Sequence, residues 1–343
     1  MNKHNSGDDT LKSNCFYYGV FTTDGFSPLF SDSAFPSERN LIVNGQSPAV
    51  KQELFDFIKK RLEQKNVFYT DFCSASGSIG IHCKDFKVFD GEFSTFSVGK
   101  SDTIFLENFQ KICTDSTEIF TEKEKNILRA KRFLEACKNI KDELIRLETP
   151  YINHTKINGF TRRLWQKIGD APKGKIGTEF IRSVTCLTAD GSELNMEAFD
   201  IFCDKILVIS DSSGAVSDII VDRLRRYALG AGYDVISCRC ALGNTEHLII
   251  PELKYGVFSS RYFHRSDFKN ERKIYAKRFL FSAADSIKFR TDFTLKAYRT
   301  MMNEVFVSLR EVEKCDKILD SIYHNATDIE KLKSMAEQNL FPT

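Results

Sequence analysis

The sequence of 343 residues has no long uncharged apolar run, no cysteine pairs at metal-site spacing and no marked excess of either charge. No segment approaches the roughly 18 apolar residues of a membrane-spanning helix, and the polar, acid-containing start does not resemble a signal peptide. Its ten cysteines are scattered, which excludes a disulfide scaffold and indicates reduced thiols. We therefore expect a cytoplasmic protein with no membrane partner.

The charges are almost balanced, with 49 Lys and Arg residues against 47 Asp and Glu residues, so the formal net charge is only +2. This balance gives no general attraction to nucleic acid. Residues 261–278 place Lys and Arg between aromatic side chains, a pattern that occurs in nucleic-acid-binding proteins. Asp267 and Glu271 interrupt the pattern, and a solvated helix face or loop is the simpler interpretation. We do not expect nucleic acid as a partner.

The sequence matches itself over most of its length. An offset of 166 residues (188 minus 22) pairs Thr22, Asp24 and Gly25 with Thr188, Asp190 and Gly191. The same offset aligns the apolar run 41–43 with 207–209 and continues without a gap into the segments that follow. A register shared over about forty residues indicates an internal duplication.

Each half has the order of a βαβ unit, namely an apolar β-branched run, a short loop of small residues, an amphipathic helix and a second strand. In the first half, strands 41–43 and 67–72 flank a helix whose apolar residues are Leu54, Phe55, Ile58 and Leu62. Long helical stretches at 123–148 and 291–323 each precede a shorter helix. The pattern predicts an α/β fold of two tandem domains with parallel sheets, each ending in a helical hairpin.

The domain boundaries follow from this pattern. We expect a disordered tail over residues 1–14, a first domain over 15–170 and a second domain over 178–343, each with its own hairpin. Residues 169–177 are rich in Gly, Lys and Pro and form the expected linker.

The loop of the first half lies where a phosphate-binding loop of the form GxxxxGK[S/T] would connect a strand to a helix. Residues 45–52 keep the first glycine, Gly45, and the lysine, Lys51. Val50 replaces the second glycine, and Gln52 replaces the hydroxyl residue that would contact Mg²⁺. Because a β-branched residue resists the backbone angles that glycine allows, the altered loop is expected to have a different shape.

The loop of the second half, residues 211–218, keeps neither the first glycine nor the lysine. Asp211 and Asp218 would repel a polyanion, with no lysine to offset them. We therefore expect no nucleotide binding there. The simpler interpretation is an ordinary strand-to-helix loop, with Asp218 as a favourable acid in the first helical turn.

Asp90 ends a predicted strand of the first half, a position where an acid often organises Mg²⁺. The Asp90-Gly91 pair is also a turn signal, so a turn role stays open. The matching residues of the second half, 257–259, contain no acid.

The chain resembles the tandem P-loop ATPase-like proteins of Gram-positive bacteria over most of its length. Residues 245–253, TEHLIIPEL, are the clearest match, supported by 232–235 and 141–144. The resemblance implies two tandem P-loop NTPase-like domains and, in proteins with intact loops, binding and hydrolysis of ATP with Mg²⁺.

For this chain we expect weak ATP and Mg²⁺ binding in the first half only, with little or no hydrolysis. The candidate nucleotide-binding residues are Gly45, Ser47, Lys51 and Gln52, and the candidate metal ligand is Asp90. One alternative is a non-catalytic scaffold, a pseudoenzyme that binds a protein partner. The other is an active ATPase with an atypical loop.

Overall fold

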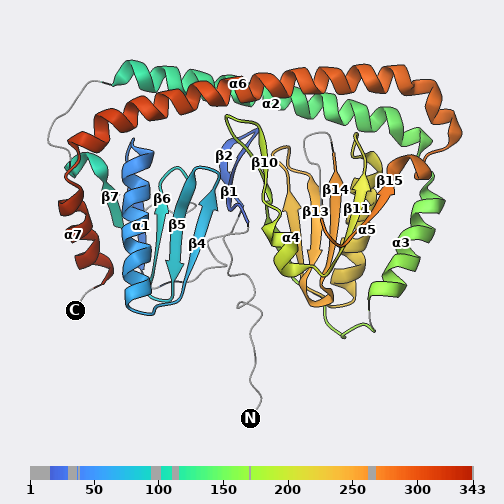
Figure 1. Ribbon diagram of the computed structural model, residues 1–343, viewed down its shortest axis with the longest axis horizontal. Helices are drawn as coiled ribbons and strands as arrows, with labels where there is room; N and C mark the ends of the chain where they lie inside the picture. The colour runs from blue at the N-terminus through green and yellow to red at the C-terminus, as the bar shows by residue number, and fades with distance from the viewer. Residues whose placement is uncertain are drawn as a thin grey trace, which may run out of the picture. The chain divides into compact units, whose positions relative to one another are not determined.

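The computed structural model describes residues 16–29, 37, 39–93, 102–109, 116–169, 171–261 and 268–341. The tail expected over residues 1–14 lies outside this part of the chain. The described residues form two larger β-sheets with helices packed against them, which confirms the α/β class (Figure 1).

The sheet of the first half has five strands in the order β4-β5-β6-β3-β7. Their bounds are β3 (Arg39–Asn44), β4 (Tyr69–Ser74), β5 (Gly77–Cys83), β6 (Phe86–Asp90) and β7 (Asp102–Phe105). Strand β3 is parallel to both of its neighbours, β6 and β7. Strand β5 is antiparallel to β4 and to β6.

The sheet of the second half has six strands in the order β15-β11-β14-β13-β12-β8. Their bounds are β8 (Glu179–Arg182), β11 (Lys205–Ser210), β12 (Val235–Arg239), β13 (Thr245–Ile250), β14 (Tyr255–Ser260) and β15 (Glu271–Tyr275). Strand β13 is antiparallel to its neighbours, whereas β11 is parallel to β14 and β15. Apart from the additional β8, this sheet repeats the first one strand for strand, as the shared register predicts.

The expectation of parallel sheets is wrong, because both sheets are mixed. Only Ala75 and Ser76 connect β4 to β5, and a connection this short joins strands only in antiparallel orientation. Residues 240–244 make the corresponding hairpin between β12 and β13. The apolar runs predict strands correctly. They do not show that the strand after each helix is joined by a short turn to an antiparallel neighbour.

Each half has a small hairpin ahead of β3 or β11 in the sequence. Its strands are β1 (Gly19–Thr22) and β2 (Gly25–Pro28) in one half, and β9 (Thr185–Leu187) and β10 (Ser192–Leu194) in the other. The hydroxyl of Thr22 donates to the carbonyl of Gly25 at 3.0 Å, and that of Thr188 donates to Gly191 at 3.2 Å. The residues that reveal the repeat in the sequence therefore make the same turn twice.

The α-helices in the described ranges are α1 (Pro48–Gln64), α2 (Thr117–Glu148), α3 (His154–Ile168), α4 (Glu197–Phe202), α5 (Ala215–Gly230), α6 (Lys288–Ala326) and α7 (Ile329–Leu340). Short 3₁₀ helices lie at η3 (Leu106–Phe109), η4 (Thr149–Tyr151), η5 (Pro251–Leu253), η6 (Ala276–Phe279) and η7 (Ser282–Ile287). None of the helices in the described ranges is both long enough and apolar enough to cross a membrane.

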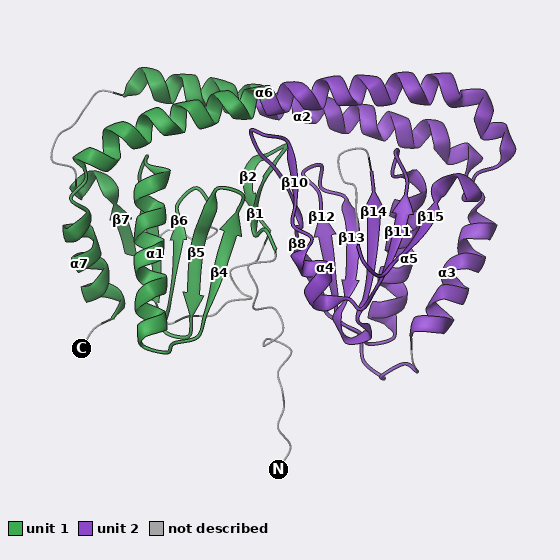
Figure 2. Ribbon diagram, viewed as in Figure 1, with its two compact units in different colours: residues 1–129, 307–343 green, residues 130–306 purple. Residues whose placement is uncertain are grey.

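Two compact units contain these elements, and Figure 2 distinguishes them by colour. Unit 1 comprises residues 1–129 and 307–343, and unit 2 comprises residues 130–306. The division falls within α2 and α6, and it therefore differs from the boundary expected near residues 169–177. Each long helix contributes to both units.

The cores explain this division. In unit 1, Leu54 and Ile58 of α1 pack in one cluster with Leu332 and Ala336 of α7. In unit 2, the apolar face of α5 shares a cluster with Ile157, Phe160 and Leu164 of α3. Helix α7, from the second half of the sequence, therefore buries its apolar face in unit 1. Helix α3, from the first half, buries its apolar face in unit 2. The expected domains with their own hairpins do not match this arrangement.

Candidate functional site

The loop before α1 in unit 1 is packed shut. A Cβ atom added to Gly45 would lie 2.5 Å from the side chain of Leu106, which is itself buried at the start of η3. The space beside the first loop glycine is therefore filled by an apolar side chain. Glycine at position 45 allows this close approach.

A carboxylate occupies the amino-terminal end of α1. The backbone N–H of Ala49 and the hydroxyl of Ser47 both donate to Oδ1 of Asp320, at 3.0 and 2.7 Å. The Ser47 hydroxyl in turn accepts a hydrogen bond from the backbone N–H of Val50 at 3.2 Å. Amides at this end of a helix are the groups that would hold a phosphate oxygen, and here they already hold acceptors from the protein itself.

The predicted lysine and acid are brought together. Nζ of Lys51 lies 2.8 Å from Oδ1 of Asp90, and their side chains are 5% and 13% exposed. Asp90 pairs with Val43 at the carboxyl end of β3, so the parallel strands place it beside the loop. Burial raises the pKa of the Asp90 carboxyl, while the charge of Lys51 opposes that shift.

The remaining predicted residue, Gln52, is fixed by hydrogen bonds along the helix and to β5. Its Oε1 accepts from the N–H of Ser78 at 2.9 Å, and its Nε2 donates to Asp56 at 2.9 Å. Within the described ranges no group of three His, Cys, Asp or Glu side chains could hold a metal ion. Lys51, Asp90, Ser47 and Gln52 thus all have partners within the protein itself.

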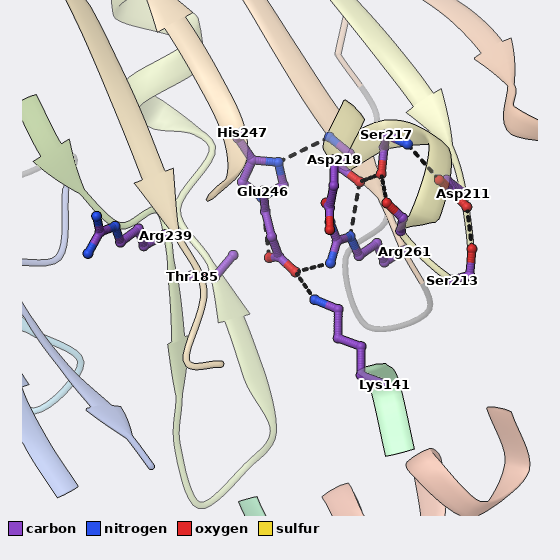
Figure 3. A network of polar contacts seen from close by, with 12 residues as sticks. Lys141, Thr185, Asp211, Ser213, Ser217, Asp218, Arg239, Glu246, His247 and Arg261 are labelled. Atoms are coloured by element: carbon purple, nitrogen blue, oxygen red, sulfur yellow. Dashed lines mark hydrogen bonds and ion pairs between the residues drawn. The ribbon is translucent and has the colours of Figure 1, made fainter. Parts of the chain in front are cut away.

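In unit 2, a residue of the loop itself fills the corresponding position. Oδ2 of Asp211 accepts from the N–H groups of Val216 and Ser217 at 2.9 and 2.8 Å (Figure 3). The hydroxyl of Ser213 donates to Oδ1 of the same carboxylate at 3.0 Å. The loop of unit 2 therefore satisfies the first backbone amides of α5 with its own carboxylate.

The two units differ at the position of the lysine and acid. The offset of the repeat pairs Lys51 with Ser217, and the strand registers pair Asp90 with Ser259. In unit 2 the hydroxyl of Ser259 donates to that of Ser217 at 2.8 Å, and both side chains are fully buried. A neutral hydroxyl pair therefore replaces the buried ion pair of unit 1.

Arg261 forms the centre of a buried charge network beside these serines (Figure 3). Its Nη1 lies 2.9 Å from Oε1 of Glu246, its Nη2 contacts Asp218, and its Nε donates to Ser259 at 3.0 Å. Lys141 of α2 lies 3.8 Å from the same Glu246 oxygen. Positive and negative groups alternate along the network, which links α2, the sheet and α5 of unit 2.

The charges of this network compensate for its burial. Burial acts to lower the pKa of Arg261, but the carboxylates of Glu246 and Asp218 outweigh it and raise the pKa above its ordinary value. Gly214 makes room for the guanidinium, because a Cβ there would lie 2.8 Å from Cζ of Arg261. The φ angle of Gly214, +87°, also favours glycine.

Sequence reasoning missed this network. It grouped Arg261 with an exposed basic stretch, whereas the side chain is only 8% exposed. It assigned Asp218 to the first turn of a helix, and the structure places it there. It did not predict that Asp218 contacts Arg261. The available signal was a single arginine directly after the apolar strand 255–260, with acids at positions 218 and 246 in the neighbouring elements.

Glu148 adds a titratable group at the start of α5. Its Oε2 lies 2.7 Å from the Ser213 hydroxyl, and burial raises the pKa of its carboxyl above the ordinary 4.5. The folded protein therefore holds a proton that the unfolded chain releases at lower pH. The resulting stabilisation is complete below pH 4.5 and is lost as the pH rises through the raised pKa.

Glu148→Gln should therefore reduce the loss of stability between pH 4.5 and neutral pH. The glutamine amide can donate to the Ser213 oxygen, as a protonated Glu148 does, but it cannot ionise. Thermal unfolding of the wild type and the variant across this range measures the effect, and the Tm of the variant should fall less with rising pH. If the Tm of the wild type and of the variant changed equally with pH, the raised pKa assigned to Glu148 would be wrong.

Comparison of the chain with protein-family models, with curated proteins and with solved structures finds no match.

Proposed function

We propose that this protein is a non-catalytic scaffold of P-loop-like architecture, in which the chain's own carboxylates replace bound phosphate in both units. One observation carries the proposal. Asp320 in unit 1 and Asp211 in unit 2 each accept a backbone N–H at the start of the helix after the loop. A phosphate would have to displace these carboxylates and would be repelled by their charge.

The chemistry of the surrounding residues supports the same conclusion. Turnover of ATP requires a metal ion, a cation on the phosphates and a group that positions water. In unit 1 the cation Lys51 already pairs with Asp90, the only acid expected to bind the metal. In unit 2 Ser217 and Ser259 hold the equivalent positions, and neither carries a charge.

A second candidate is residual ATP binding by unit 1, which the juxtaposition of Lys51 and Asp90 favours. These two groups lie 2.8 Å apart at the carboxyl ends of parallel strands, where nucleotides bind in open α/β sheets. For binding, Asp320 would have to leave the helix end, and Lys51 would have to exchange Asp90 for a phosphate. The two candidates differ in what happens when Asp320 is removed.

Millimolar Mg-ATP should leave the Tm of the wild-type protein unchanged and should not be hydrolysed. A ligand present at a hundred times its Kd would add about 2.7 kcal/mol of stability, so binding of useful strength would be visible. Robust Mg-dependent turnover that is lost in Lys51→Ala would refute the scaffold proposal.

Asp320→Ala frees the N–H of Ala49 and the hydroxyl of Ser47, whereas Asp320→Asn removes the charge but keeps an oxygen acceptor in place. Calorimetric titration with Mg-ATP compares the two. Binding in Asp320→Ala that disappears in Asp320→Ala with Lys51→Ala would favour the second candidate. No binding in either variant is the result expected for the scaffold.

A further inference from the structure

A groove in unit 2, lined by apolar and charged side chains, has no role in the loops described above. It lies between the carboxyl-terminal turns of α2 and the first turns of α6, and its volume is about 590 Å³. Its apolar lining consists of Leu147, Pro150, Tyr151, Ile287, Phe289 and Phe293. The 3₁₀ helix η4, which follows α2, supplies Pro150 and Tyr151 of this lining. The 3₁₀ helix η7, which precedes α6, supplies Ile287.

Two phenylalanines of α6 border the groove with most of their surface in solvent. Phe289 is 84% exposed and Phe293 is 67% exposed. Residues four apart on a helix lie on the same face, so the two rings form one apolar edge. Single exposed apolar residues are common, but two large rings beside a concave apolar surface are typical of an interaction site.

The charges at the groove leave one cation in excess. Arg146 pairs with Glu143 one turn away on α2, so these two lining residues cancel each other. Arg290 lies between the two phenylalanines in sequence and also lines the groove. In the part of the chain that the structure describes, its guanidinium makes no hydrogen bond or ion pair. A carboxylate from outside would complete this site.

We propose that this groove binds an acidic segment of a partner protein that carries aromatic or leucine anchor residues. The apolar floor accepts the anchors, and Arg290 accepts a carboxylate beside them. Aromatic and aliphatic anchors in a concave pocket with a charged rim are the usual energetic centre of a protein interface. This inference goes beyond the proposed function, and its failure would leave the argument on phosphate binding unaffected.

A protein segment fits this groove better than nucleic acid does. Nucleic-acid binding depends on several phosphate contacts, and only one lining cation is free to supply one. The apolar residues of the lining have no counterpart in a polyanionic backbone. Partner segments that fold on binding place apolar anchors in such grooves and use flanking charges for specificity.

Fluorescence anisotropy on the full chain tests the proposal with a short fluorescein-labelled peptide of alternating Asp and Leu or Phe. A matched peptide with Lys for every Asp and an oligothymidylate of equal length serve as comparison probes. The acidic peptide should bind at least about tenfold more tightly than either. Equal binding of the three probes, tighter binding of the oligothymidylate, or no binding of the acidic peptide would overturn the proposal.

Variants assign the binding to the groove. Phe289→Ser with Phe293→Ser changes exposed side chains only and should weaken binding of the acidic peptide by about tenfold or more. Arg290→Glu should reverse the preference toward the lysine peptide. Phe105→Ser, at a 49% exposed phenylalanine of unit 1, is the matched control and should have no effect. Unchanged affinity in the groove variants, or a wild-type dimer in sedimentation that these variants dissociate, would refute the assignment.

Discussion

Arg261→Met will lower the free energy of unfolding of unit 2 by about 3–5 kcal/mol, because removing one partner of a buried ion pair leaves the other uncompensated. Methionine preserves much of the volume of the side chain but none of its charge. Glu246 and Asp218 would then stay buried without the guanidinium that contacts both. Urea-induced unfolding measures the change.

Arg225→Met is the matched control for this prediction. Arg225 contacts Glu179 and Asp222, but its side chain is 25% exposed, and solvent screens these pairs. Its loss should cost no more than about 1 kcal/mol. Adding Glu246→Gln to Arg261→Met removes one carboxylate that has lost its partner, and it should restore part of the lost free energy of unfolding. Similar costs for Arg261→Met and Arg225→Met would show that the buried network contributes little to stability.

Lys51→Ser will destabilise unit 1 by about 3–5 kcal/mol for the same reason, since Asp90 loses its buried partner. The second unit suggests a rescue, because Ser217 and Ser259 hold the equivalent positions as a hydrogen-bonded pair. Lys51→Ser with Asp90→Ser should therefore destabilise unit 1 by about 0.5–3 kcal/mol less than the sum of the two single variants, the range of coupling between contacting residues.

A double-mutant cycle over the two positions, with unfolding free energies from urea titration, measures this coupling. Lys125→Ser breaks an exposed pair with Glu122 and should change stability by less than about 1 kcal/mol. If the double variant were as unstable as the sum of the two single variants, the equivalence of the ion pair and the hydroxyl pair would be wrong.

Part of the candidate site follows directly from the sequence. Lys51 and Asp90 were identified from the position of the loop and from the end of a predicted strand, and they meet because parallel strands align their carboxyl ends. The altered residues of the second loop were also expected to disfavour phosphate. The sequence contained no indication of the acid that fills the first loop, because Asp320 lies on a helix 273 residues away from Ser47.

The charge network shows the same limit. Lys141, Asp218, Glu246 and Arg261 come from four separate elements, and each one alone resembles an ordinary surface charge. Their burial depends on how α2 and α5 pack on the sheet. Periodicity identifies which face of a helix is apolar, but it does not identify the partner of a charged residue beside that face.

The sequence by itself determined the α/β class, the duplication and the order of strand, loop and helix in each half, because local periodicity and a shared register encode these features. Only the tertiary structure decided the antiparallel return of β5 and β13, the packing of α7 on α1 and of α3 on α5, and the carboxylates at the helix ends. These depend on contacts between segments far apart in the chain. Many pairings of apolar faces satisfy the same periodicity, and only side-chain packing selects among them.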